Sequence, residues 1–513
     1  MKKIFSLKKA SAFFAIILAL SACQKDDFPF FEKLPFPDSK DIKKLDLTFY
    51  ALADDGIKLD KFSTKNLSKI VSSTSVSGLQ GGEKILAIDF RPATGQLYGL
   101  GSANRLYVIN TETGAARMIG TAPFSPALSG DLAGFDFNPT VDRIRVVTSK
   151  GQNLRLNPET GTVAAVDGDI NGQTGVMLAG AAYENNVAGA TTTDLYDIDV
   201  TTSKLFKQSP PNDGTLVEVG ALGLSIEGEG GFDISAKDGL ALGLFKEYDK
   251  STLFSVNLET GKAIVLAKFD MSQMYTGIAI PTQPVAYAVD AGNHLLIFNP
   301  EKPAVSVSKP ISGTAPGETI LGIDFRPANG QLYALGSSST LYTINASSGA
   351  ATSVGMLSTP ISGTHFGFDF NPTVDRIRII SNTGQNLRVN PTDGVAIVDG
   401  QLNPGTPAVT AAAYANNFAG ATSTMLFGID TQADKLFQLS PPNDGTLVEI
   451  GNLGINAEAA NGFDISSTEG MAYALLTAGG STKLYTINTT TGVAKASSSF
   501  SSPVSGFTIG LGF

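Results

Sequence analysis

The strongest constraint on the fold is that the chain repeats itself once along its length. The segment GFDFNPTVDRIR stands unchanged at Gly134–Arg145 and at Gly367–Arg378. A second segment, SPPNDGTLVE, stands unchanged at Ser209–Glu218 and at Ser440–Glu449. A period this long indicates a duplicated structural unit, so the two halves of the chain should share one fold.

Within each copy, a shorter rhythm of four apolar strands separated by turns recurs. Residues 85–120, for example, contain ILAIDF, QLYGLG, RLYVIN and AARMIG in that order, with the alternating or fully apolar pattern of short strands. Equivalent first-strand positions recur at about the spacing of one four-stranded propeller blade. These positions are Asp89, Asp136, Ala182, Asp233 and Ala279 in the first copy, and Asp324, Asp369, Ala413, Asp464 and Gly512 in the second.

The chain is therefore predicted to be an all-β protein, a β-propeller with ten four-stranded blade units. Each copy opens with strands two to four of a blade and ends with a lone first strand, TGIAI at 276–280 and TIGLGF at 508–513. Such a strand can complete the opening blade, which favours two five-bladed propellers in tandem. The joint at 281–284 spans only about 14 Å at full stretch, which keeps one ten-bladed ring open as the alternative.

Glycine closes the same turn in many of these units. The turns read INTETG, LNPETG, VNLETG, INASSG, VNPTDG and INTTTG. A glycine at the end of such a hairpin turn is expected at positive φ, because a side chain there would be strained. The glycines are Gly114, Gly161, Gly261, Gly349, Gly394 and Gly492.

The N-terminus predicts export and a lipid anchor. Four lysines precede the apolar run Ala12–Leu20, which is too short to span a membrane as a stable helix. The following LSAC at residues 20–23 resembles a bacterial lipobox, which implies that residues 1–22 are a signal peptide and that Cys23 is lipidated, for example with palmitate. Residues 23–44 would then be a lipid-anchored tether, followed by propeller repeats at 45–281 and 282–513. Gln24–Asp27 resembles the export tag of surface lipoproteins, so the prediction is an outer-membrane lipoprotein exposed at the cell surface.

Charge and cysteine content exclude several other classes. Removing residues 1–22 deletes four lysines and no acid, which takes the formal charge from −10 to −14. No basic run follows the leader, so nucleic acid is not an expected partner. Cys23 is the only cysteine, which rules out an intrachain disulfide and a cysteine metal site.

Three segments of each copy together resemble the DUF4394 family of uncharacterised bacterial domains. They are ILAIDFRPATGQLYGLG (ILGIDFRPANGQLYALG in the second copy), GFDFNPTVDRIR and SPPNDGTLVE. The resemblance covers about residues 47–513. It implies a propeller-like domain in exported proteins, and it implies no reaction.

Repeated aspartates form the first candidate site. Six of the ten equivalent first-strand positions carry Asp, and first strands line the central channel of a propeller. Carboxylates gathered there could bind Ca²⁺, which prefers six to eight oxygen ligands, although no cofactor is required by the sequence. The alternative is that each Asp accepts backbone N–H bonds and fixes the blades. The candidate metal ligands are Asp89, Asp136, Asp233, Asp324, Asp369 and Asp464.

Arginines and an inserted loop form two further candidate binding sites. Alternating arginines on one strand and a third on the next could hold an anionic group; the alternative is pairing with Asp136 and Asp142, or Asp369 and Asp375. The SPPNDG loop is a rigid turn by composition, but an inserted loop on a propeller rim often binds. The residues are Arg143, Arg145, Arg155, Asn212 and Asp213 in the first copy and Arg376, Arg378, Arg388, Asn443 and Asp444 in the second.

No catalytic residues are assigned. The two histidines, His294 and His365, are not equivalent between the copies, and HExxH and P-loop motifs are absent. The predicted function is a non-enzymatic, surface-anchored lipoprotein whose propellers bind a protein or glycan ligand. One alternative is an exported propeller enzyme, a Ca²⁺-assisted hydrolase or lactonase. Another is a structural or assembly factor of the cell envelope.

Overall fold

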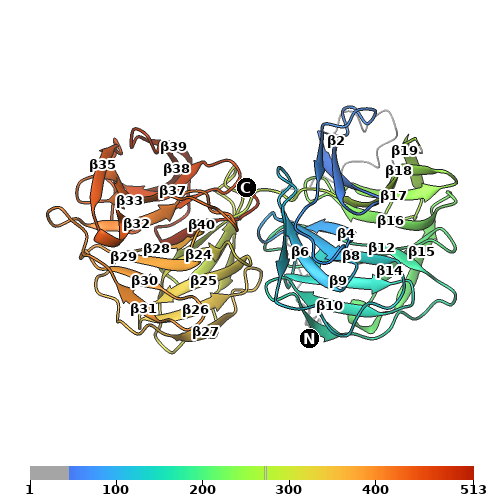
Figure 1. The fold of residues 1–513 in the computed structure, drawn as a ribbon, viewed down its shortest axis with the longest axis horizontal. Helices are drawn as coiled ribbons and strands as arrows, with labels where there is room; N and C mark the ends of the chain where they lie inside the picture. The colour runs from blue at the N-terminus through green and yellow to red at the C-terminus, as the bar shows by residue number, and fades with distance from the viewer. Residues whose placement is uncertain (1–45, 271, 273) are drawn as a thin grey trace, which may run out of the picture.

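The computed structural model describes residues 46–270, 272 and 274–513, which form two lobes of similar size (Figure 1). The first lobe is residues 46–281 and the second lobe is residues 282–513. The predicted signal peptide, Cys23 and the tether lie outside the described residues. Among the residues that are described, no helix has the length and apolar character needed to cross a membrane.

The first lobe contains five antiparallel sheets of four strands each. From inner to outer strand these are β20 (Tyr275–Ala279), β1 (Thr48–Ala53), β2 (Lys58–Ser63) and β3 (Ser72–Ser75); β4 (Ile85–Phe90), β5 (Leu97–Gly101), β6 (Arg105–Ile109) and β7 (Ala116–Ile119); β8 (Ala133–Asn138), β9 (Arg143–Thr148), β10 (Asn153–Asn157) and β11 (Thr162–Val166); β12 (Leu178–Tyr183), β13 (Leu195–Asp199), β14 (Lys204–Gln208) and β15 (Leu216–Ala221); and β16 (Glu227–Ile234), β17 (Ala241–Glu247), β18 (Lys250–Val256) and β19 (Ala263–Lys268).

The second lobe repeats this arrangement with five more sheets. They are β40 (Val504–Ile509), β21 (Ala286–Asp290), β22 (His294–Phe298) and β23 (Ser306–Pro310); β24 (Ile320–Arg326), β25 (Gln331–Gly336), β26 (Thr340–Ile344) and β27 (Ala351–Met356); β28 (Phe366–Asn371), β29 (Arg376–Ser381), β30 (Asn386–Val389) and β31 (Ala396–Val398); β32 (Val409–Tyr414), β33 (Leu426–Asp430), β34 (Lys435–Leu439) and β35 (Leu447–Asn452); and β36 (Asn461–Ile465), β37 (Ala472–Ala478), β38 (Ser481–Ile487) and β39 (Ala494–Ser499). Two short 3-10 helices, η2 (Pro211–Asp213) and η3 (Pro442–Asp444), interrupt the strands.

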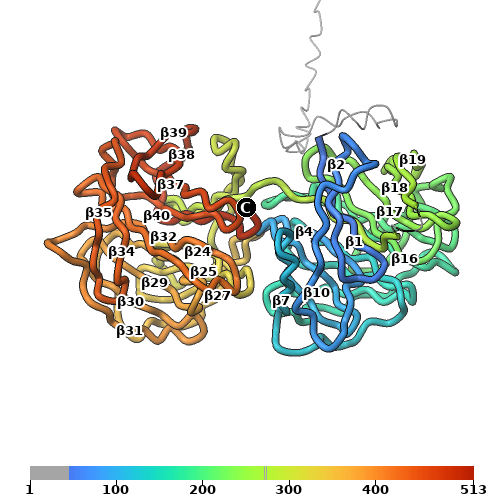
Figure 2. Tube along the Cα trace, turned by 45° about the horizontal axis from the view of Figure 1, so that its top comes forward, coloured from blue at the N-terminus to red at the C-terminus, as the bar shows by residue number. Residues whose placement is uncertain are grey.

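The last strand of each copy pairs with the first strand of the same copy. Tyr50 of β1 lies opposite Ala279 of β20, and Ala286 of β21 lies opposite Ile509 of β40. In each lobe the five inner strands also contact one another in succession, including β20 with β4 and β40 with β24. This pairing favours two five-bladed propellers over one ten-bladed ring, and Figure 2 shows the same two lobes from a second direction.

One strand boundary differs from the sequence prediction. The final strand β40 ends at Ile509, whereas the sequence predicts a strand at 508–513. The position equivalent to Ala279 is therefore Thr508 and not Gly512. The last residues leave the sheet and contact the first lobe, where Gly512 N donates to Thr94 O at 2.7 Å. Figure 1 accordingly shows the C-terminus between the two lobes.

The inner strands approach closely because small residues line them. A Cβ atom on Gly134 would lie 2.8 Å from Ala181 N of the next inner strand, and one on Gly231 would lie 2.5 Å from Ile278 N. These distances are shorter than a side chain tolerates, so glycine permits the approach. The six turn glycines have φ between 69° and 81°, which confirms the turn prediction.

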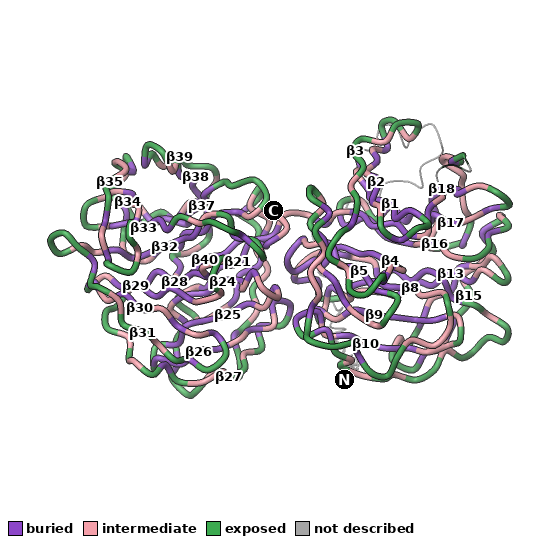
Figure 3. The backbone as a smooth tube through the Cα atoms, in the orientation of Figure 1, coloured by how far each residue is buried: buried purple, intermediate pink, exposed green. Residues whose placement is uncertain are grey.

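The hydrophobic core lies between successive sheets. Tyr98 of one sheet packs edge-on against Phe137 of the next, with ring centroids 5.1 Å apart, inside a cluster that also holds Ile144 and Leu154. Figure 3 shows buried residues along the strands inside each lobe and exposed residues mainly in the loops and outer strands. The functional candidates on the inner strands are therefore the most enclosed ones.

Candidate functional site

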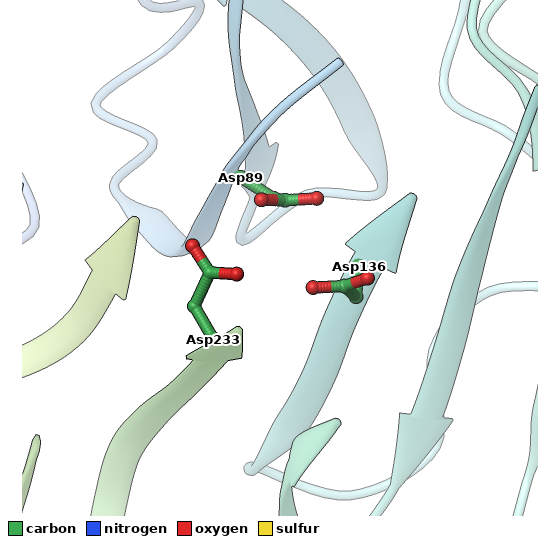
Figure 4. Close-up of side chains that lie close together, drawn as sticks. All are labelled: Asp89, Asp136 and Asp233. Carbon is green, nitrogen blue, oxygen red and sulfur yellow. The ribbon is translucent and has the colours of Figure 1, made fainter. Parts of the chain in front are cut away.

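Three of the predicted aspartates meet on the axis of the first lobe. Asp89 of β4, Asp136 of β8 and Asp233 of β16 each offer a carboxylate oxygen, and these oxygens all lie within 4.8 Å of one another. Each residue is 1% exposed. Figure 4 shows the three carboxyl groups turned toward a common space. We call this group the first axial triad.

Backbone N–H groups hold most of these carboxylate oxygens in place. Asp89 accepts hydrogen bonds from Phe90 N (2.7 Å) and Phe137 N (2.8 Å). Asp233 accepts from the backbone N–H groups of the residue after it and of Ile280, both at 2.6 Å. Each aspartate therefore links its own strand to a neighbouring inner strand. This agrees with the alternative prediction that the aspartates accept backbone N–H bonds and fix the blades.

Asp136 is less well satisfied than the other two. Its Oδ1 accepts from Tyr183 N at 2.9 Å, while its Oδ2 has no hydrogen-bond partner among the described residues. Burial raises the pKa of Asp136 and of Asp89 well above the usual carboxyl range, and neighbouring carboxylates raise it further. Burial also raises the pKa of Asp233 to about 7. Three buried negative charges at this spacing repel one another, so protons or a cation must neutralise them.

The second lobe has an equivalent group with one chemical difference. Asp324, Asp369 and Asp464 bring carboxylate oxygens within the same 4.8 Å, and we call them the second axial triad. Here the Thr508 hydroxyl lies 2.9 Å from Asp324 Oδ1 and 2.9 Å from Asp464 Oδ2. The first lobe has Ala279 at this position, so it lacks that hydroxyl. The burial of the carboxyls raises all three pKa values, that of Asp464 to about 6.

Each axial triad adjoins a very small cavity. In the first lobe the cavity measures about 10 Å³ and is lined by the inner-strand segments just before the aspartates, including Ala87, Gly134, Gly231 and Gly277. The second lobe has a cavity of the same size. A volume of this kind holds about one water molecule. The six aspartates themselves are buried, so their carboxylates are enclosed by the protein.

The predicted arginines are brought together, with partners other than those expected. Arg145, which is 1% exposed, donates to Asn153 Oδ1 (2.7 Å), Asp167 Oδ2 (2.6 Å) and Asn212 Oδ1 (2.7 Å). Arg155 holds the same Asp167 by two hydrogen bonds of 2.7 and 2.8 Å. Arg378, Arg388, Asp399 and Asn443 reproduce this network in the second lobe.

The expected pairing of these arginines with Asp136 and Asp142, or with Asp369 and Asp375, was therefore wrong. Asp136 lies opposite Arg145 in the strand pairing, but its Oδ1 accepts from Tyr183 N, whereas the guanidinium of Arg145 donates to Asp167. Arg143 donates only to the backbone oxygen of Asp142, at 2.7 Å, and Arg376 repeats this contact with Asp375 O at 2.9 Å. The donors of Arg145 are thus already engaged within the protein.

The SPPNDG loop connects neighbouring sheets. In the first lobe Asn212 O accepts from Gly168 N at 2.9 Å, and Gly214 closes the loop at φ 70°, where a Cβ would lie 2.4 Å from Asp169 O. Asp213 and its counterpart Asp444 remain exposed. These contacts give a structural reason for the unchanged sequence of the loop in both copies.

Sequence reasoning missed an arginine between the lobes. Arg91 is fully buried, and its guanidinium contacts both carboxylate oxygens of Asp142, Glu159 at 2.6 Å and the backbone oxygen of Gly330 in the other lobe at 3.0 Å. Its counterpart Arg326 pairs with Asp375, and a threonine replaces the second acid. The sequence carried one sign of this site: Glu159 is present in the first copy and is replaced by threonine in the second.

The fold and these sites define a class of protein: a tandem β-propeller with buried acidic residues on both axes. No curated protein matches the sequence significantly. The chain belongs to the family described as a domain of unknown function (DUF4394), which matches it twice, at residues 58–279 and 294–508.

Two solved structures resemble the chain at 13% sequence identity each. One is PorZ, an essential bacterial surface component of the type-IX secretion system of Porphyromonas gingivalis; the match covers 89% of this chain and 58% of PorZ, with a TM-score of 0.26. The other is the Dos1 propeller, where the match covers 65% of this chain and 90% of that one, with a TM-score of 0.25. The chain thus spans just over half the length of PorZ.

Proposed function

We propose that this protein is a non-enzymatic lipoprotein of the cell surface whose two propellers form a binding scaffold for a protein or glycan ligand. The burial of the axial carboxylates supports this function over a hydrolase that would use them. A ligand would instead contact a surface away from the two axes.

The observation that carries the proposal is an apolar recess between the lobes. It measures about 70 Å³, which is room for a few water-sized groups or one branched aliphatic side chain. Binding sites are frequently found where two domains meet. The lining residues are Val187, Ala188, Gln283, Pro284, Val285, Ile297, Phe298, Asn299, Val305, Ser306 and Val307. An apolar side chain of a protein ligand fits this recess best.

A matched pair of variants tests the recess. Val305 lines it and is 41% exposed, whereas Val166 lies on an outer strand of the first lobe and is 62% exposed. Val305→Asp should reduce the capture of surface proteins by the immobilised chain, while Val166→Asp should leave it unchanged. Equal capture by wild type and Val305→Asp would exclude the recess, and a glycan array on the same proteins would show whether a sugar is the ligand instead.

The lipobox supports the proposed location in the outer membrane. Cys23→Ala should abolish incorporation of labelled palmitate and release the protein from membranes. Protease added to intact cells should remove the wild-type protein from the surface. Complete protection of the protein in intact cells would contradict surface exposure.

A further inference from the structure

We propose that Asp89, Asp136 and Asp233 form a Ca²⁺-binding centre on the axis of the first lobe, and that the hydroxyl of Thr508 takes the place of the ion in the second lobe. This proposal is independent of the proposed function. It concerns a buried structural ion that joins three inner strands.

The spacing of the carboxylates fits one ion of this size. Ca²⁺ binds oxygen ligands at roughly 2.3–2.6 Å, so two ligands on opposite sides of one ion are about 4.8 Å apart. The ligand oxygens of the first axial triad lie within 4.8 Å of one another. Mg²⁺ usually keeps several water ligands, for which the nearby cavity of about 10 Å³ has no room. The separation of the three carboxylate oxygens therefore stays within the span of one bound Ca²⁺.

A second observation points to a ligand that protein atoms do not supply. Asp136 Oδ2 is buried and has no hydrogen-bond partner among the described residues, and Figure 4 shows the carboxyl of Asp136 facing those of Asp89 and Asp233. A buried carboxylate oxygen without a partner is costly. No ion pair of the described chain includes these three aspartates, so a cation between them would supply the missing partner.

The surroundings can complete the coordination shell. The nearby cavity, whose lining includes the residue directly before each aspartate, has room for about one water molecule. Water is a normal ligand of Ca²⁺, which accepts six to eight oxygens from mixed sources. The same narrowness would keep the bound ion away from bulk solvent and from larger molecules.

The difference between the two lobes makes the proposal specific. Thr508 lies at hydrogen-bond distance from carboxylate oxygens of both Asp324 and Asp464. Its side chain thus occupies the region between these carboxylates and supplies one donor, while protons held by the buried carboxyls remove the charge that a neutral hydroxyl cannot. Ala279 in the first lobe supplies none. We therefore expect one Ca²⁺ per chain, bound in the first lobe.

Isothermal titration of the chain from residue 24 onward with CaCl₂, after removal of metals by EDTA, tests this. Wild type should bind one Ca²⁺ and show a Ca²⁺-dependent rise in Tm. Asp136→Asn should weaken binding at least ten-fold, while the matched second-lobe variant Asp369→Asn should retain it. Wild type that binds no Ca²⁺, or binding that survives Asp136→Asn, would overturn the proposal.

Exchange of the distinguishing residue gives a test that does not depend on loss of binding. Thr508→Ala should raise the stoichiometry from one Ca²⁺ to two, and Ala279→Thr should weaken the site of the first lobe at least ten-fold. Circular dichroism checks that each variant is folded. An unchanged stoichiometry in folded Thr508→Ala would refute the role assigned to the hydroxyl.

Discussion

Replacing Asp197 by Asn should stabilise the protein, and the gain should grow as the pH rises. Asp197 lies in β13, is fully buried, and neither of its carboxylate oxygens has a partner among the described residues. Gln208 Oε1 is also buried without a donor. The second lobe carries Gly428 and Leu439 at these two positions, where a Cβ on the glycine would lie 3.3 Å from Leu439 Cδ1. The same strand pairing, with Leu195 opposite Gln208, makes positions 197 and 208 diagonal neighbours in the first lobe.

The size of the effect follows from the pKa of Asp197. Burial raises this pKa from 3.8 to about 8, so at neutral pH the folded protein keeps a proton that the unfolded chain releases. Stability is therefore lost as the pH rises from about 4 to about 8, at about 1.4 kcal/mol per pH unit. Between pH 5 and pH 7 the loss is about 3 kcal/mol. Asn cannot ionise, and its amide can donate to Gln208 Oε1 at every pH.

Urea unfolding of wild type and Asp197→Asn at pH 5 and pH 7, followed by far-UV circular dichroism, measures this difference. The axial carboxylates also titrate, but they are present in both proteins and cancel in the comparison. The advantage of the Asn variant should increase by about 3 kcal/mol over these two pH units. A difference that does not change with pH would mean that Asp197 is ionised in the folded protein, and the reasoning would fail. The double variant Asp197→Gly/Gln208→Leu, which copies the second lobe, should be more stable than either single variant.

Three other predictions concern Gly114, Arg145 and Arg91, the last two with a matched control substitution. Gly114→Val should lower the Tm measured by calorimetry and cost about 3 kcal/mol, because Gly114 has φ 74° and a Cβ there would lie 1.9 Å from Ser75 O. Arg145→Met should cost about 1–3 kcal/mol in urea unfolding, since it removes the buried hydrogen bonds to Asn153 and Asn212 and leaves Asp167 with Arg155 alone; Arg143→Met should stay within about 0.5 kcal/mol. Arg91→Ala should speed proteolysis between the lobes at residues 281–284, whereas the counterpart Arg326→Ala should not; equal rates would show that Arg91 does not hold the lobes together.

The repeat and the turn chemistry were sufficient to predict the architecture. The four-strand rhythm gave the ten sheets, and each predicted turn glycine has positive φ. The convergence of Asp89, Asp136 and Asp233 was also predictable, because equivalent positions on inner strands must meet at the axis of a propeller. Local pattern and rotational symmetry together fix these features.

Other features depend on choices that a sequence pattern leaves open. The segment GFTIGLGF fits the last strand in two registers. The sequence pattern therefore predicts Gly512 at the position equivalent to Ala279, where the structure has Thr508. A long guanidinium can reach several carboxylates, and which one it contacts depends on the direction that its side chain takes, as Arg145 shows. The burial of Arg91 depends on how two complete lobes dock, which no repeat within one lobe encodes.

The pairing of β1 with β20 also constrains the order in which the chain can fold. Tyr50 pairs with Ala279, and Ala286 pairs with Ile509. In each lobe, one edge of the first-synthesised strand therefore stays unpaired until more than two hundred further residues have been made. Contacts this distant in sequence form slowly, because a long loop must be closed first. The two long segments that must be closed do not overlap in sequence, because the first lobe ends where the second begins. A chain emerging from its N-terminus can therefore complete the first lobe before the second has the strands that would compete for the same edge.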